Sequence, residues 1–269
     1  MNALINNATI NLIDEGPRNG QPVLFVHGFP FSHAMWSEQL RVVSQQYRAI
    51  AYDVRGHGES LVGDGQYTIE GHVEDLIALI DHLALPPVVI VGLSMGGYIA
   101  LRALERNPER FRAAVLCDTR SEADNNEGKL RRAAGAVAVK RDGSAVFADG
   151  FVKAVFAAHS LAAKPDAVRA IHDVIRSTPP LSIAGTLIAL AARTDTTASL
   201  EALSLPTLIL VGEHDVTTPP AASQAMHERI RGSELFIVPD AAHMSNLENP
   251  EFFNEKLLYF LKRVGSLRQ

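Results

Sequence analysis

The chain has a single cysteine among its 269 residues, so no disulfide can form within it. Cys117 ends an apolar run, where a lone cysteine is expected to be a small buried side chain. There is no run of Lys and Arg, and the net charge of −5 offers no basic surface to nucleic acid. The N-terminus lacks a basic segment followed by a long apolar stretch, so no signal peptide is expected.

Long apolar runs are also missing, and no segment of the sequence is apolar over the length of a membrane span. We therefore expect a cytoplasmic protein without membrane or nucleic-acid partners. Apolar residues make up 47% of the chain and charged residues 20%, which is ordinary for a globular protein. The length suits one α/β domain with room for an insertion. The sequence leaves the oligomeric state open.

The most informative stretch begins with four consecutive β-branched residues, Val88 to Val91, which are typical of a strand buried on both faces. The pattern Gly-x-Ser-x-Gly follows at 92–96, and a helical periodicity begins directly after it. A strand that turns into a helix this abruptly needs a sharp, strained turn with Ser94 at its apex. This order of strand, serine and helix predicts that Ser94 is a nucleophile with its hydroxyl exposed above the sheet.

Other apolar runs alternate with helical patterns along the chain, which favours a mostly parallel sheet with helices on both faces. In such sheets the functional residues gather at the carboxyl ends of the strands. Strands are expected near residues 8–13, 22–26, 47–52, 88–91, 113–116, 206–212 and 234–238.

Residues 120–200 differ from the rest because they contain no convincing strand pattern. They are rich in alanine and lie between two expected strands. The breaks in the pattern predict four helices, near 124–140, 144–157, 166–177 and 180–192. We expect a core domain formed by residues 1–119 and 201–269, and a helical cap domain formed by residues 120–200.

A serine nucleophile needs a base and an acid that orients the base. Of the ten histidines, His243 follows the last expected strand and is the best base, whereas His72 lies on a helix and is expected at the surface. Asp215 and Asp118 both follow strands. Asp215 gives the chain order Ser, Asp, His that accompanies this type of turn. We prefer Asp215 as the acid and expect Asp118 to cap a helix or to contact the cap hinge.

Two backbone N–H groups are expected to bind the negative charge that develops on a carbonyl oxygen. Met95 lies at the N-terminus of the helix after Ser94, where the helix dipole favours negative charge. Phe29 lies in the loop after the strand at 22–26, and its neighbour Pro30 has no N–H to offer. The rings of Phe29 and Phe31 are expected to line the substrate pocket. The side chain of His27 is interpreted as a structural, hydrogen-bonded one.

Taken together, these motifs resemble the α/β-hydrolase fold, and more narrowly the bacterial carboxylesterases and 3-oxoadipate enol-lactonase-like proteins. The resemblance implies a mostly parallel eight-stranded sheet with an inserted helical cap. Dehalogenases and epoxide hydrolases of this fold have aspartate at the position of Ser94, and proline iminopeptidases typically have tryptophan at that of Met95. The residues that carry the resemblance lie at 27–30, 53–60, 92–97, 212–219 and 239–243, with 117–124 at the start of the cap.

The expected function is hydrolysis of small carboxylic esters through an acyl-enzyme, with neither a metal nor an organic cofactor. A lactonase of the 3-oxoadipate enol-lactonase type is an alternative, since Arg120 or an arginine of the cap would bind a carboxylated lactone. Perhydrolases and cofactor-free haloperoxidases share the same triad and stay open as alternatives. A ligand receptor without enzymatic activity is disfavoured because the triad is intact.

Overall fold

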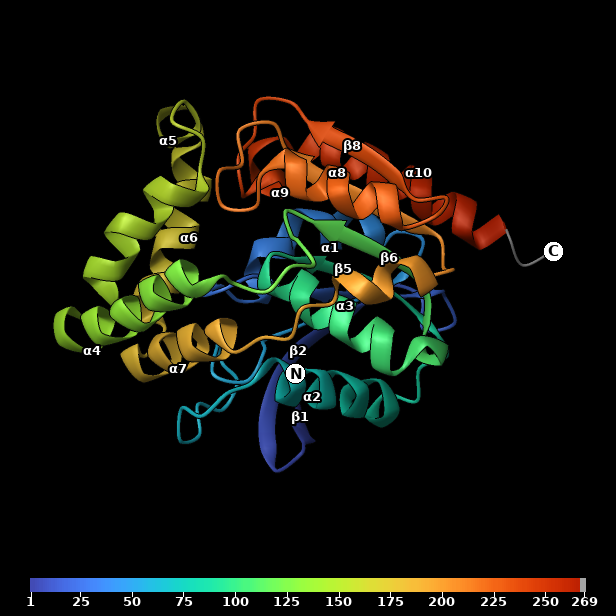
Figure 1. Ribbon diagram of the computed structural model, residues 1–269. Coiled ribbons are helices and arrows are strands. Elements are labelled where there is room, and N and C mark those ends of the chain that lie inside the picture. Colours follow the sequence, from blue (N-terminus) through green and yellow to red (C-terminus); the bar gives the residue numbers. More distant parts are fainter. Residues whose placement is uncertain (267–269) are drawn as a thin grey trace.

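The computed structural model describes residues 1–266 and contains one eight-stranded sheet (Figure 1). The strand order is β1-β2-β4-β3-β5-β6-β7-β8. The β1–β2 and β2–β4 pairs are antiparallel, and the remaining pairs, from β4–β3 to β7–β8, are parallel. The expected mostly parallel sheet is thereby confirmed. The strands are β1 (Asn2–Ile5), β2 (Ala8–Glu15), β3 (Pro22–Val26), β4 (Arg48–Tyr52), β5 (Val88–Leu93), β6 (Phe111–Cys117), β7 (Thr207–Gly212) and β8 (Glu234–Val238).

The strand β1 was not expected from the sequence. It forms a hairpin with β2 through Asn6 and Asn7, which have φ angles of 45° and 61°. Two-residue hairpin turns of this kind need positive φ, and asparagine tolerates it better than most residues. The Asn-Asn pair between two short alternating runs was therefore the available signal for this hairpin.

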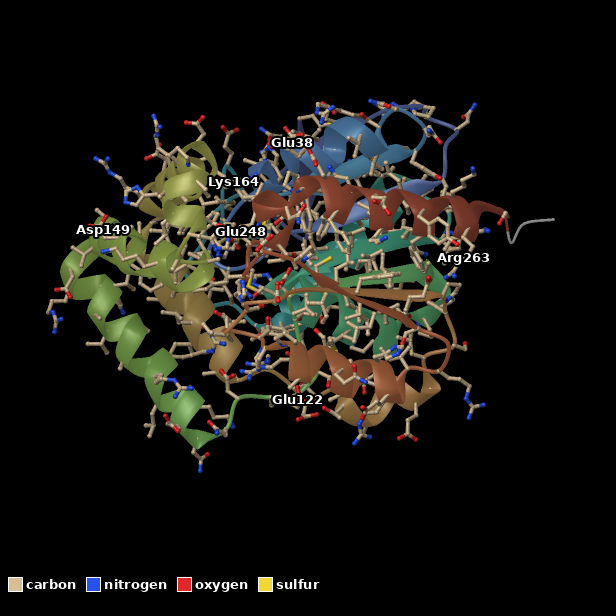
Figure 2. The ribbon with its side chains drawn as sticks, turned by 90° about the horizontal axis from the view of Figure 1, so that it is seen from above. Glu38, Glu122, Asp149, Lys164, Glu248 and Arg263 are labelled. Carbon is tan, nitrogen blue, oxygen red and sulfur yellow. The ribbon has the colours of Figure 1, made fainter. Side chains whose placement is uncertain are left out.

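Helices cover both faces of the sheet. In Figures 1 and 2, α1 and α10 lie on one face, and α2, α3 and α8 lie on the other. All six residues of β5 are buried between these layers, as its β-branched run predicted. The helices of these layers are α1 (Ser37–Val43), α2 (Ile69–His82), α3 (Met95–Arg106), α8 (Pro220–Arg229) and α10 (Pro250–Ser266), with shorter turns at η1 (His33–Trp36), η2 (Pro108–Arg110) and α9 (Ser245–Glu248).

Residues 120–200 contain helices and no strand, as expected. They lie at the side of the sheet toward which the arrowheads of β6 and β8 point (Figure 1). The break expected between the first two helices is confirmed, because the backbone of α4 is non-helical at Gly143, with φ 86° and ψ 167°, and the helix kinks there although it carries a single label. The division into a core and a cap domain stays a prediction. The elements of this segment are α4 (Asn126–Val155), α5 (Ser160–Ala163), α6 (Pro165–Ser177), α7 (Pro180–Ala191) and η3 (Thr197–Ala202).

Within residues 1–266, no single helix has both the length and the apolar character needed to cross a membrane. Only α6 and α7 taken together meet that test, and they are bent by 97° at their junction.

Besides His243, three histidines between residues 1 and 266 are buried, and His72 is one of them, so its expected surface position was wrong. The rings of His27 and His57 lie 5.4 Å apart, and His72 stacks on Tyr67 at 5.8 Å. Burial lowers the pKa of His27 and of His72 to about 4 and the pKa of His57 to about 3. All three are therefore neutral in the folded protein at neutral pH.

We expect the free energy of unfolding to fall when the pH is lowered from 7 to 5. The unfolded chain binds protons at these histidines below about pH 6.5, whereas the folded chain does not, so stability rises with pH in this window. Each histidine contributes a loss of about 2 kcal/mol over this range. The pKa of Asp118 is raised in the folded protein, as described below, so this one group increases the stability as the pH falls. Urea unfolding at both pH values measures the difference.

The His72→Phe variant is the control for this prediction. It keeps a ring of similar size beside Tyr67 and removes one titrating group. The difference in unfolding free energy between pH 7 and pH 5 should shrink by about 2 kcal/mol. An unchanged difference would mean that His72 does not contribute to the acid sensitivity.

Candidate active site

Ser94 lies in the sharp turn between β5 and α3, as the sequence predicted. Its φ and ψ angles are 55° and −115°, a strained combination for a residue with a side chain. The turn needs small neighbours. A Cβ atom on Gly96 would lie 2.1 Å from the carbonyl oxygen of Val26, and one on Gly97 would lie 2.3 Å from Thr119 Oγ1. This close packing places Ser94 at the carboxyl end of β5, in the middle of the sheet.

Hydrogen bonds to the next strand hold the turn in place. The N–H of Ser94 donates to the carbonyl oxygen of Cys117 at 3.0 Å, and Thr119 Oγ1 donates to the carbonyl oxygen of Ser94 at 2.8 Å. Ser94 is only 8% exposed, so the expectation of an exposed serine was wrong.

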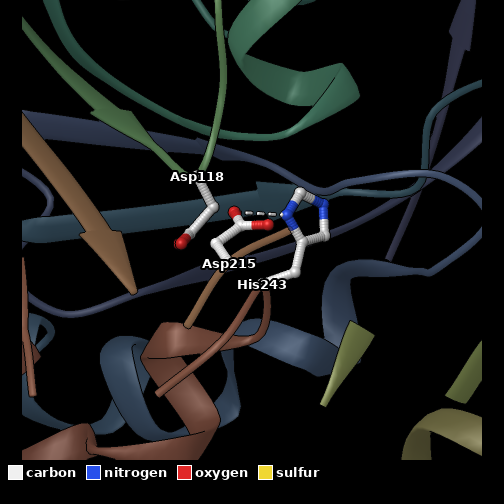
Figure 3. Close-up of side chains that lie close together, drawn as sticks. All are labelled: Asp118, Asp215 and His243. Carbon is white, nitrogen blue, oxygen red and sulfur yellow. Dashed lines mark hydrogen bonds and ion pairs between the residues drawn. The ribbon is translucent and has the colours of Figure 1, made fainter. Parts of the chain in front are cut away.

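Asp215 and His243 follow β7 and β8 and meet above the ends of these strands (Figure 3). His243 Nδ1 lies 2.8 Å from Asp215 Oδ2. The carboxylate also accepts hydrogen bonds from the N–H groups of Thr217 and Thr218 and from the Thr218 hydroxyl. Burial alone would raise the pKa of Asp215, but the charge of His243 and these hydrogen bonds outweigh it and lower the pKa. An ionised Asp215 only accepts, so Nδ1 of His243 carries the proton and Nε2 is left as an acceptor.

Asp118 also approaches this pair. One oxygen of Asp118, one of Asp215 and one ring nitrogen of His243 all lie within 4.8 Å of one another. Within residues 1–266, the Asp118 side chain forms no hydrogen bond to the backbone N–H groups of a helix N-terminus or to the helical segment, so neither expected role is supported. It accepts hydrogen bonds from the N–H of Gly212, at 2.9 Å, and from the hydroxyl of Ser245. It therefore connects the loop of Asp215 with the first residue of α9, directly after the loop of His243.

The two carboxyl groups differ in their protonation. Asp118 is completely buried, and burial together with the negative charge of Asp215 raises its pKa well above the usual range. No arginine, lysine or histidine forms an ion pair with it in the described part of the chain. A neutral Asp118 beside an ionised Asp215 avoids two adjacent buried charges.

The two backbone N–H groups expected to bind an oxyanion are available as hydrogen-bond donors. Met95 is the first residue of α3, where helical N–H groups lack internal partners, and Phe29 lies in the loop after β3. Neither N–H donates a hydrogen bond to another group between residues 1 and 266. Likewise, neither Ser94 Oγ nor His243 Nε2 is hydrogen-bonded among the described residues. Such contacts are often long in free enzymes and tighten when substrate binds.

The loop of Phe29 is held by buried polar groups behind it. His27 Nε2 accepts from the N–H of Val54 at 2.9 Å, and its Nδ1 lies 2.8 Å from the carbonyl oxygen of Gly28. This confirms the structural interpretation of His27. Asp53 accepts hydrogen bonds from the N–H and the ring of His33. Burial favours a raised pKa for Asp53, but these and further hydrogen bonds hold its pKa well below the usual range.

The rings of Phe29 and Phe31 are buried and pack against α4. Phe29 meets Phe147 and Phe151 edge to face, with ring centroids 6.1 Å and 5.8 Å apart, and Phe31 meets Phe151 at 6.0 Å. The contribution of α4 to this cluster was missed from the sequence. The available signal was the spacing of four residues between Phe147 and Phe151, which places them on one face of a helix.

Glu248 links the helical segment to the loop of His243, and it was also missed. Its carboxylate accepts from the N–H of Ala242 and from the N–H of Ala157, each at 2.8 Å. The N–H of Met244 in the same loop donates to the carbonyl oxygen of Val155 at 3.2 Å. Figure 2 shows Glu248 between the helical segment and the C-terminal helices. A single acidic residue in a polar stretch gave no sign of this role.

Arg120 was considered as an anchor for a carboxylated substrate. In the structure its guanidinium pairs with Asp124 at 2.9 Å, and Arg132 and Arg193 pair with the same carboxylate. Burial raises the pKa of Asp124, but Arg132 and Arg193 outweigh this effect and keep the pKa below its usual value. Arg120 is therefore part of a structural ion-pair cluster at the start of the helical segment.

The fold, the turn at Ser94 and the Asp215–His243 pair define the class of this protein. The chain belongs to the alpha/beta hydrolase fold family, whose model matches residues 21–250. It is similar to 3-oxoadipate enol-lactonase 2 of Acinetobacter baylyi, with 29% identity over 96% of this chain and 95% of the relative. It is also similar to a putative non-heme chloroperoxidase of Synechocystis, with 32% identity over 96% and 97%.

Among solved structures, a thermophilic esterase of Thermogutta terrifontis matches with a TM-score of 0.93 and 34% identity, covering 98% of each chain. Together, the family and these similarities support a hydrolase that resembles carboxylesterases and enol-lactonases.

Proposed function

We propose that the protein hydrolyses small carboxylic esters with Ser94, His243 and Asp215 as its catalytic triad. The observation that carries this proposal is the hydrogen bond from His243 to Asp215 at the strand ends, in the same edge of the sheet as the strained turn of Ser94. The solved esterase with a TM-score of 0.93 supports an ester as substrate.

In this mechanism Ser94 Oγ attacks the ester carbonyl carbon while His243 Nε2 takes its proton. Asp215 keeps the ring in the tautomer with Nε2 free and stabilises the imidazolium that forms. The N–H groups of Phe29 and Met95 bind the oxyanion, each contributing roughly 3 kcal/mol in comparable sites. His243 then protonates the leaving alcohol, and water activated by the same ring hydrolyses the acyl-enzyme. Each of these steps uses only groups of this chain, the substrate and water.

Short acyl esters, from acetate to about hexanoate, are expected to react faster than long ones. The packed rings of Phe29, Phe31, Phe147 and Phe151 restrict the space beside the expected oxyanion site. A pocket gains affinity with each methylene only until it is full. The measurement is kcat/KM for p-nitrophenyl esters of increasing length. A maximum at decanoate or longer would contradict a small pocket.

A lactonase is the second candidate because the relative from Acinetobacter baylyi is a 3-oxoadipate enol-lactonase. A carboxylated lactone needs a cationic partner in the pocket, and the pairing of Arg120 with Asp124 speaks against this residue. We therefore rank the ester first. Including a carboxylated enol-lactone in the kinetic series separates the two, since a strong preference for the lactone would favour the second candidate. Perhydrolysis and haloperoxidation on the same triad are the further alternatives.

A further inference from the structure

A groove on the surface of α4 has no role in the mechanism described above. It has a volume of about 380 Å³ and is lined by residues of α4 between Ala138 and Ala154. We call it the α4 groove. All its lining residues are apolar or glycine except Asp142, and Val146 in its wall is 59% exposed. A concave, mostly apolar space of this size is typical of small-molecule sites.

The bend of α4 creates the groove. Gly143 interrupts the helical backbone with a φ of 86°, which separates α4 into two arms. The next residue, Ser144, is buried and donates a hydrogen bond from its hydroxyl to the carbonyl oxygen of Thr178 at the end of α6. The second arm is thereby fixed in direction. Gly150 lines the groove, and a Cβ atom at this position would lie in open space, with no other atom within 4 Å.

The second arm of α4 also contacts both loops that flank the candidate active site. Phe147 and Phe151, which line the groove, stack on each other at 5.2 Å and pack edge to face on Phe29. Phe29 carries one of the two expected oxyanion N–H groups. At the other end of the arm, the carbonyl oxygen of Val155 accepts from the N–H of Met244, the residue after His243.

From this arrangement we propose that the α4 groove binds the apolar chain of the ester substrate. The inference rests on the proposed ester hydrolysis and names the part of the substrate that the groove receives. A chain that lies against Phe147 and Phe151 is one aromatic ring away from the loop that is expected to hold the carbonyl oxygen. Apolar walls select an alkyl or aryl group, and the one charged lining residue, Asp142, is paired with Arg141.

The Gly150→Phe variant tests this proposal by filling the groove. The new side chain meets no atom at its Cβ, and replacing a glycine within a helix favours helix formation. The measured quantity is the ratio of kcat/KM for p-nitrophenyl hexanoate to that for the acetate, because general damage to the site cancels in this ratio. Each methylene that loses its apolar contact lowers kcat/KM roughly fourfold, so the ratio should fall at least about tenfold.

The matched control is Val137→Phe, which adds the same ring to α4 at a side chain that is 67% exposed and does not line the groove. Its ratio should equal that of the wild type. Val146→Trp, in the groove wall, should lower the ratio as Gly150→Phe does. An equal ratio in wild type and in both groove variants, or an equal fall in the Val137→Phe control, would overturn the proposal.

A binding experiment separates failure of the groove from failure of the proposed function. Hexyl acetate is titrated calorimetrically into Ser94→Ala, with and without Gly150→Phe. Weaker binding in the groove variant supports the proposal even if no ester is turned over, and equal binding overturns it. Turnover of p-nitrophenyl hexanoate and of hexyl acetate then shows whether the groove receives the acyl or the alcohol chain.

Discussion

Replacing Ser94 with alanine is expected to lower kcat for ester hydrolysis more than about 10⁵-fold, as loss of the nucleophile does in a comparable triad. The side chain is small and its hydroxyl forms no hydrogen bond within residues 1–266, so its removal leaves the packing unchanged. The backbone contacts of the turn, from Ser94 N–H to Cys117 and from Thr119 Oγ1 to the Ser94 carbonyl oxygen, do not involve the hydroxyl. Initial rates with p-nitrophenyl butyrate measure the effect.

Labelling with a fluorophosphonate checks the same assignment without a chosen substrate. The wild type should be labelled, and Ser94→Ala should not. Circular dichroism and the midpoint of thermal unfolding should show that the variant is folded. Ester hydrolysis within tenfold of the wild type would reject Ser94 as the nucleophile, and a folded wild type without labelling would favour a ligand-binding protein.

Asp215→Asn is expected to lower kcat about 10⁴-fold, whereas Asp118→Asn should stay within tenfold of the wild type. Asparagine at 215 donates its amide N–H to Nδ1 of His243 and so favours the tautomer in which Nε2 carries the proton. That ring no longer acts as a base. At position 118 the carboxyl group is neutral, and the amide of asparagine has the same shape and still accepts from the N–H of Gly212.

Asp166→Asn is the control for a change of surface charge, because the side chain of Asp166 is 95% exposed. The three variants are compared by kcat and by thermal unfolding. A large loss at Asp118 with little at Asp215 would reverse the assignment of the acid. Comparable losses at both positions would mean that both carboxyl groups, and not Asp215 alone, are needed to orient His243.

Much of the fold was visible in the sequence because local patterns determine it. The β-branched run before Gly92 predicted a buried central strand, and the helical periodicity after Ser94 predicted α3. Asp215 and His243 were chosen because each follows an expected strand, and parallel strands bring their carboxyl ends to one edge. The structure brings these two side chains together, and the catalytic roles of the triad stay a prediction.

What the sequence did not reveal depends on contacts between distant segments. The role of Asp118 requires that Gly212 and Ser245 meet it, and both lie more than 90 residues away along the chain. Glu248 acquires its role only through the N–H of Ala157. His72 is buried because Tyr67 and the neighbouring loops cover it, although its helix has an exposed face. Periodicity carries no information on such pairings.

The hydrogen bonds of Glu248 also limit how segments can be exchanged between related enzymes. A chimera in which a foreign segment 120–200 places its backbone differently at positions 155 and 157 would lose the hydrogen bonds from the N–H of Ala157 to Glu248 and from the N–H of Met244 to Val155. The foreign segment would then leave a buried carboxylate short of a donor next to the loop of His243. Recombination points that keep residues 144–157 with the C-terminal loop are therefore the ones that suit hybrid enzymes built from this chain.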